Sequence, residues 1–200
     1  LDANTTADNN TAVGTAALGA NTTAAGNSAV GHNALLKNTT GTRNTALGSC
    51  ALCNATTVGY NTAIGQEALN SNTSGSVNTA IGNGALYLNT TGASNISVGS
   101  NSLADNTTGG SNVAVRRDAL GNNTTASNNT AVGYRALNDN TTGTRNVSMG
   151  ADAMYQTTTG NDLVGIGNEA LTRNTTGSSN VAIGKEALAQ NTTASFNTAV

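Results

Sequence analysis

The chain has little of what an ordinary globular core is built from. Of its 200 residues none is Pro or Trp, the aromatic residues are four Tyr and one Phe, and 9% are charged. Collagen is excluded because it needs Gly at every third position together with Pro. No apolar run approaches the ~18 residues of a membrane-spanning helix, so we expect no membrane insertion. The formal net charge of −2 excludes strong electrostatic attraction to nucleic acid, which we do not expect as a partner.

Residue types that carry chemistry are equally scarce. The sequence has one His and two Cys, and its ten acidic residues form no cluster. It contains no Ser-His-Asp set, no phosphate-binding loop and no paired carboxylates, the groups that activate a nucleophile or hold a metal. We therefore expect no enzymatic activity, no cofactor and no metal site.

What the sequence does contain is a repeat. The segment Asn10-Thr11-Ala12-Val13-Gly14 returns every 17 residues, at 27–31, 44–48 and onward to Asn197, with no insertion or deletion and with Leu163 once in place of Asn. Numbered from this Asn, the unit reads N-T-A-V-G-x-x-A-L-x-x-N-T-T-G-x-x. We treat residues 1–200 as a single repeat domain. Because the sequence starts and stops within a unit and has no cap, we expect it to be a segment of a longer array.

The pattern within the unit predicts an all-β fold. Position 4 is always aliphatic or Met, and position 9 is Leu except at Met154. Helical periodicity is absent, whereas a fixed unit with Gly at corners is typical of a β-solenoid of parallel β-roll or β-helix type. We predict one 17-residue repeat per coil and about twelve coils, at a rise of about 4.8 Å each. Two ranks should be buried, Val13, Val30, Leu47, Ile64 and Ile81 at position 4, and Leu18, Leu35, Leu52, Leu69 and Leu86 at position 9.

Charged and aromatic side chains are confined, except for Arg116, to positions 6, 7, 10, 11, 16 and 17, which we expect to face solvent. Direct stacking of coils then predicts ladders between side chains 17 residues apart. Arg135 should lie between Asp118 and Asp152. Arg145 should meet Asp162, and Arg43 should lie against Tyr60.

The segment Asn180-Val181-Ala182-Ile183-Gly184 resembles the N-S-V-A-I-G repeat in the head domains of YadA-type trimeric autotransporter adhesins. The fuller unit also resembles repeats of phage tail-fibre shafts. The resemblance implies a left-handed parallel β-roll, a homotrimer, and an extracellular, cell-surface or virion location with attachment to a host-surface glycan or matrix. From the residues alone, a single-chain solenoid and an end-to-end filament of identical chains stay open beside the trimer.

The Thr pair at positions 13 and 14 is the most regular polar feature. On a solenoid it forms two ladders, one of which should face inward and the other outward. Turn and ladder hydrogen bonding explains it, and an ice- or glycan-binding face is the alternative. The residues of that ligand face would be Thr22, Thr39, Thr56, Thr73, Thr90, Thr107, Thr124 and Thr141.

Asn at position 12 creates a series of N-x-S/T sequons, which glycosylation in a secreted protein would use. The alternative, which we favour, is a ladder of Asn side chains at a corner. The candidate sites are Asn21, Asn38, Asn72, Asn89, Asn106, Asn123, Asn140, Asn174 and Asn191.

Three irregular features remain. Cys50 and Cys53 form a C-x-x-C without a redox or zinc context and are expected to be surface thiols, with a disulfide as the alternative. His32 occupies a variable position and is expected to be solvated. Arg116 breaks the Gly pattern of position 5, either as a local defect or as a ligand site. We expect the whole to be a structural repeat segment of an extracellular fibre: a surface filament, adhesin or tail-fibre shaft.

Overall fold

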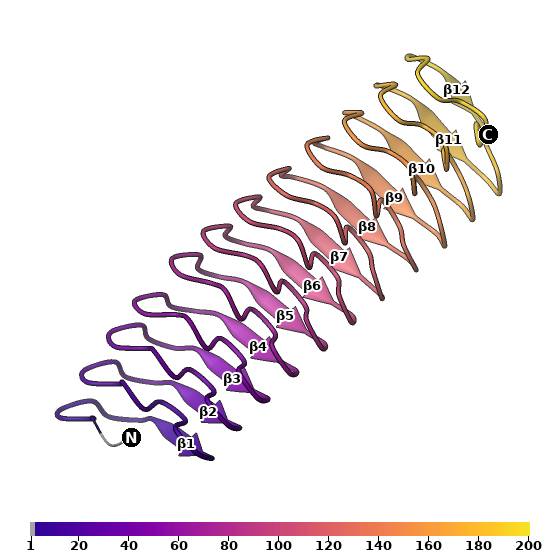
Figure 1. Cartoon of the computed structure of the whole chain (residues 1–200). Helices are drawn as coiled ribbons and strands as arrows, with labels where there is room; N and C mark the ends of the chain where they lie inside the picture. The colour runs from indigo at the N-terminus through magenta and orange to yellow at the C-terminus, as the bar shows by residue number, and fades with distance from the viewer. Residues whose placement is uncertain (1–2) are drawn as a thin grey trace.

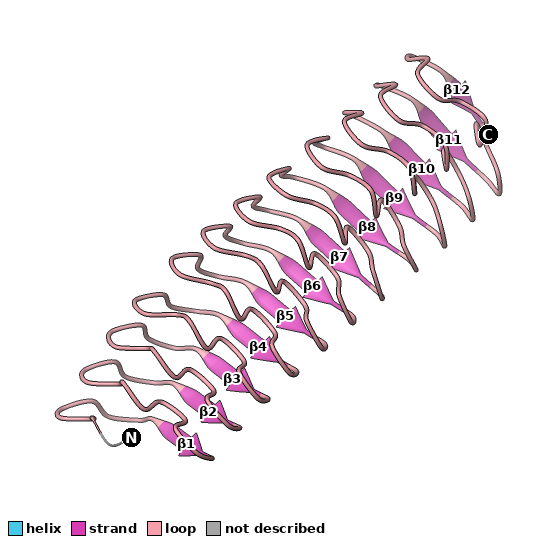
Figure 2. Cartoon of the chain, in the orientation of Figure 1, coloured by secondary structure: helices cyan, strands magenta, loops and turns pink. Residues whose placement is uncertain are grey.

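The computed structural model describes residues 3–200, which form a β-solenoid with one short strand in every coil (Figure 1). Twelve strands lie side by side in a single sheet in sequence order, and the described residues contain no helix (Figure 2). The strands are β1 Thr11–Val13, β2 Ser28–Val30, β3 Thr45–Leu47, β4 Thr62–Ile64, β5 Thr79–Ile81, β6 Ile96–Val98, β7 Val113–Val115, β8 Thr130–Val132, β9 Val147–Met149, β10 Val164–Ile166, β11 Val181–Ile183 and β12 Thr198–Ala199.

Successive coils stack in strict register. Ala12 pairs with Ala29 and Val13 with Val30, and the same offset continues to the pairing of Ala182 with Ala199. All strand pairs are parallel, because each coil runs once around the axis before the chain returns to the same face. The prediction that residues 17 apart lie directly above one another is therefore confirmed.

The core is a column of Leu side chains surrounded by methyl groups. The predicted rank at position 9 is confirmed, since Leu18, Leu35, Leu52, Leu69 and Leu86 are all fully buried. Around it lie the Ala residues of positions 3 and 8, which are also buried in most coils. A core of one large side chain per coil is narrow, and the rest of the interior is polar.

Two ladders of Asn side chains fill the polar part of the interior. At position 12, Asn38 Nδ2 donates to Asn21 Oδ1 in the neighbouring coil (3.3 Å) and to the Gly41 carbonyl of its own coil (2.9 Å). At position 1, the backbone N–H of Asn27 donates to Asn10 Oδ1 (2.9 Å), while Asn27 Nδ2 donates to the same Gly41 carbonyl (2.8 Å). Buried amides are acceptable here because each coil supplies the hydrogen-bond partners of the next.

The other predicted rank is not buried, and this prediction was wrong. At position 4 the exposed fraction is 57% for Val13 and 45% for Leu47, and 37% for Ile81. Val30 is also exposed, and Ile64 is half-buried. Strand residues alternate between faces, and the small side chain of position 3 takes the inner face because Leu and Asn leave room only for a methyl group.

The corner after each strand requires Gly, as predicted. Gly48 has φ of +140°, and a Cβ placed on it would lie 2.4 Å from the Gly65 carbonyl oxygen of the next coil. The close approach belongs to the stacking itself, because the corner of one coil rests on the backbone of the next. Arg116 stands at the one non-Gly corner of this kind and has φ of 98°.

Candidate interaction face

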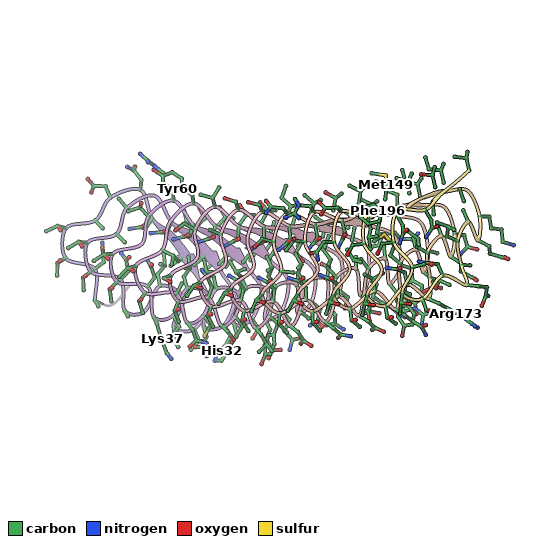
Figure 3. The ribbon with its side chains drawn as sticks, turned by 90° about the horizontal axis from the view of Figure 1, so that it is seen from above. His32, Lys37, Tyr60, Met149, Arg173 and Phe196 are labelled. Atoms are coloured by element: carbon green, nitrogen blue, oxygen red, sulfur yellow. The ribbon has the colours of Figure 1, made fainter. Side chains whose placement is uncertain are left out.

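The outward side of the sheet is a regular surface that follows the solenoid along its length. In every coil the side chains of positions 2 and 4 point away from the core, and strand pairing sets them about 4.8 Å apart along the axis. Met149 marks this side in Figure 3, and His32, Lys37 and Arg173 lie on the opposite side. Neither position carries a charged residue in any of the strands.

We call the side chains of position 4 the aliphatic rank. Its members are either exposed or half-buried, and they follow one another without interruption. Position 2 beside it holds Thr or Ser in the first five strands and mostly Val or Ile from β6 onward, with Ile96 exposed. The aliphatic rank comprises Val13, Val30, Leu47, Ile64, Ile81, Val98, Val115, Val132, Met149, Ile166 and Ile183.

Position 17 forms a border beside the sheet that is polar in most coils and apolar at Val77 and Phe196. Arg145 Nε and Nη2 donate to the two carboxylate oxygens of Asp162 (2.6 and 2.9 Å), as the ladder prediction required. The hydrogen bond from Arg145 lowers the pKa of the Asp162 carboxyl, and the Arg145 charge adds to the effect. The Arg43 guanidinium lies 5.3 Å from the Tyr60 ring centroid and its Nη1 donates to the Tyr60 hydroxyl, which confirms the second predicted contact.

A stack of alternating Arg and Tyr side chains runs along coils seven to nine. The order of the stack is Arg117, Tyr134, Arg135 and Tyr155. The Tyr134 ring centroid lies 4.8 Å from the Arg117 guanidinium and 4.8 Å from that of Arg135, and the Arg135 guanidinium lies 4.6 Å from the Tyr155 ring centroid. Arg135 pairs with Asp152 at 2.8 Å, as predicted. Its second predicted partner, Asp118, pairs instead with Arg117 at 3.1 Å. Sequence reasoning missed the stack, although Arg117 and Tyr134 are 17 residues apart at position 6 and the recurrence could have found that contact. Arg135 at position 7 and Tyr155 at position 10 are brought to it only by the turn geometry.

The Thr pair lies at a bend of the chain. The position 13 hydroxyls donate to the carbonyl of the corresponding Thr in the next coil, for example Thr90 Oγ1 to the Thr107 carbonyl at 2.9 Å. The candidate ligand-face residues all do this except Thr56, and they are half-buried or exposed. Position 14 Thr residues are exposed throughout, so neither rank faces inward. Hydrogen bonding between coils accounts for the Thr residues of position 13, and the bend places them at an edge of the rod.

The sequon residues belong to the position 12 ladder. Asn21, Asn38, Asn72, Asn89 and the later members to Asn174 are fully buried, and Asn191 in the last coil is half-buried. The amide nitrogen to which a glycan is attached points into the core and donates to a carbonyl, as Asn106 Nδ2 does to the Gly109 carbonyl at 2.9 Å. The folded solenoid therefore favours the ladder interpretation over glycosylation at these residues.

Cys50 and Cys53 are both free thiols in one coil. Cys53 is buried, which corrects its expected surface position, and burial, reinforced by a hydrogen bond with Cys50, raises the pKa of its thiol to about 11. His32 is exposed, as expected.

Within residues 3–200 no group of three or more His, Cys, Asp or Glu side chains is placed to hold a metal ion. The described part of the chain also has no helix that is long and apolar enough to span a bilayer.

The chain was compared with protein-family models, with curated proteins and with solved structures, and none of the three comparisons gave a significant match.

Proposed function

We propose that this chain is a structural repeat segment of an extracellular fibre, in which identical chains pack side by side through the aliphatic rank as a homotrimer. The observation that carries the proposal is the uninterrupted, uncharged and exposed aliphatic rank on a regular sheet. Soluble monomers rarely expose a contiguous apolar patch larger than a few hundred Å². An apolar surface that follows the whole rod has a natural partner in another rod of the same period.

A second copy of the chain suits this surface better than an unrelated partner. The rank repeats at the strand spacing of about 4.8 Å, and only another solenoid offers ridges and grooves at the same spacing over the same length. Position 4 varies among Val, Leu, Ile and Met, and position 2 changes from Thr to Val along the rod. An ice-binding face gains from a uniform array, so this variation favours packing between chains.

The test is the mass of the intact chain in solution. Light scattering coupled to gel filtration should give three copies of the 19.7 kDa chain. Substitution of two central members of the rank, Ile81→Lys and Val98→Lys, should yield a folded monomer, because it places charges in an apolar interface without touching the core. A monomeric parent chain would contradict the proposal.

The matched control places the same charges elsewhere on the rod. Thr91 and Thr108 occupy the exposed Thr corner of the same two coils as Ile81 and Val98. The variant Thr91→Lys/Thr108→Lys should keep the parent mass. Dissociation of this control as well would attribute the effect to net charge and not to the aliphatic rank.

The extracellular location is part of the same proposal and rests on the resemblance of the repeat unit to adhesin heads and tail-fibre shafts. Labelling of intact cells or particles with antibody against the chain tests it directly. Labelling that appears only after the cells are opened would contradict it.

A further inference from the structure

Arg116 is the one residue of position 5 that departs from the Gly pattern of the corner. The other corner residues of position 5 are Gly with φ between 120° and 149°, whereas Arg116 adopts φ of 98° with a full side chain. The corner keeps its hydrogen bonds, from Arg116 N to the Val98 carbonyl at 2.7 Å and from Ala119 N to the Arg116 carbonyl at 3.3 Å. Positive φ at non-Gly residues recurs along this chain, but the other values lie between 50° and 63°, and Arg116 alone lies outside that range. A non-Gly residue held in a sparsely populated region costs on the order of 1–3 kcal/mol, and such strain concentrates at functional sites.

Two departures from the repeat in the core have a partner that compensates for them. Gly165 leaves the space that Met154 fills in place of Leu, because a Cβ on Gly165 would lie 2.7 Å from the Met154 Sδ. Ser97 and Ser102 replace two core Ala residues together and hydrogen-bond to each other. For Arg116 no such compensation is present. Its side chain is exposed and makes no ion pair or side-chain hydrogen bond within the described residues.

The residue after Arg116 and the coils that follow it carry side chains that are held in place by one another. The next residue, Arg117, is held by Asp118 through Nε (3.1 Å) and by the Tyr134 hydroxyl through Nη2 (2.9 Å), with its guanidinium over the Tyr134 ring. Arg135 and Tyr155 continue the stack on the following coils. Residues fixed in this way lose little conformational freedom when a ligand binds. Arg116 supplies the one guanidinium there whose charge is unpaired.

We propose that Arg116, with Arg117 and Tyr134, binds a uronate-containing saccharide at the edge of the sheet where the strands end. The Arg116 guanidinium holds the sugar carboxylate, for which its planar fork is suited, and the Arg117 guanidinium and the Tyr134 hydroxyl hydrogen-bond to sugar hydroxyls. Asp118 and Asp152 lie close by and repel a densely charged chain, so a saccharide with one carboxylate every two sugar rings fits better than a nucleic acid. This site is independent of the association of chains through the aliphatic rank.

The test uses the full chain and a fluorescent hyaluronan octasaccharide, with polarisation measured at physiological salt. Arg116→Gly restores the repeat consensus, so it should raise the melting temperature while lowering the affinity at least tenfold. Arg116→Lys should bind with intermediate affinity, because it keeps the charge but loses the two-pronged hydrogen bond. Arg173→Gln removes the same charge on the opposite side of the rod, where Arg173 bonds only to Gln190, and should bind like the parent (Figure 3).

Comparison ligands decide between this site and general attraction of anions. A single-stranded DNA oligonucleotide and a heparin octasaccharide should bind no more tightly than hyaluronan. Tighter binding of either one would overturn the proposal, as would unchanged hyaluronan affinity in Arg116→Gly or an equal loss in Arg173→Gln. A lower melting temperature for Arg116→Gly would show that the corner is not strained and would remove the premise.

Discussion

At the residue scale the position 12 ladder depends on buried amides whose carboxamide oxygens accept a hydrogen bond from the Asn of the next coil. The position 12 ladder is interrupted twice, by Ala55 and by Thr157, and each interruption leaves the preceding carboxamide oxygen, Asn38 Oδ1 or Asn140 Oδ1, without a partner in the core. The Thr157 hydroxyl is also unsatisfied. An unpaired buried polar group costs roughly 1–3 kcal/mol, so these two coils are the weak points of the rod.

Restoring the ladder should therefore stabilise the chain. Ala55→Asn supplies the missing donor for Asn38 Oδ1, and we expect the free energy of unfolding to rise by about 1 kcal/mol, measured by urea denaturation. Ala93→Asn adds the same side chain at an exposed position and should leave stability unchanged. A loss of stability in Ala55→Asn would mean that Cys53 and Val58, both buried nearby in the same coil, have closed the space.

The pair Arg145–Asp162 predicts a pH dependence with a definite sign. The pKa of Asp162 is lowered in the folded chain, so its contribution to stability is present above the ordinary carboxyl pKa of 3.8 and is lost as the pH falls through the lower, folded value. NMR titration of the carboxyl carbon should show this depressed pKa, and Arg145→Gln should return it toward 3.8. Both side chains are largely exposed, so the effect on total stability should be small. An unchanged pKa in Arg145→Gln would contradict the assignment of cause.

At the element scale, the cross-section of a coil is set by the combined volume of the side chains at positions 3 and 9. The strand presents its small residue inward, and the residue at position 9 occupies the space behind it. In most coils the combination is Ala with Leu, and once it is Gly165 with Met154. The volumes of the two positions therefore change together.

Because the two positions share one space, the effects of substitutions at Gly165 and Met154 on stability should be strongly coupled. Gly165→Ala alone brings a methyl group into the Met154 side chain and should destabilise the chain by about 1–3 kcal/mol, the usual cost of overpacking. The double variant Gly165→Ala/Met154→Leu restores the common combination and should recover the parent stability. Denaturant unfolding of the parent, both single variants and the double variant measures the coupling energy. Additive effects would show that the two positions do not share one space.

The sequence predicted the period, the strand positions, the Leu column and three of the surface contacts, because all of these follow from residues recurring 17 apart. It did not predict which face of the strand is buried. Alternation places Val13 and Ala12 on opposite faces but does not say which face is inner. Burying the larger residue is the usual choice, and it is wrong here because Leu18 and the Asn ladders already fill a narrow core. The contacts of Arg135 with Tyr134 and Tyr155 and the strain at Arg116 depend on turn geometry, which recurrence does not encode.

At the scale of the whole molecule, each coil contacts only its neighbours, as in other solenoids. Deletion of residues 61–77 removes one complete coil and leaves every remaining coil in register. We expect this variant to fold, to unfold cooperatively and to lose only the share of one coil in the total stability.

Deletion of residues 61–76 provides the comparison. It removes one residue fewer but leaves a coil of 18 residues, whose extra residue must bulge out of the ladders on both sides. Circular dichroism and urea unfolding should show this variant to be the less stable of the two. Equal stability would mean that the register between coils is not what holds the rod together.

The same independence of coils bears on how the gene can change. Unequal recombination between near-identical repeats adds or removes whole units of coding sequence, and each such unit specifies one self-contained coil. The length of the rod can therefore vary between closely related genes in steps of one coil while its cross-section and surface stay the same. Point substitutions have the opposite scope, since a change at position 5, as at Arg116, alters one level of the rod and the backbone that it rests on, and leaves the other levels unchanged.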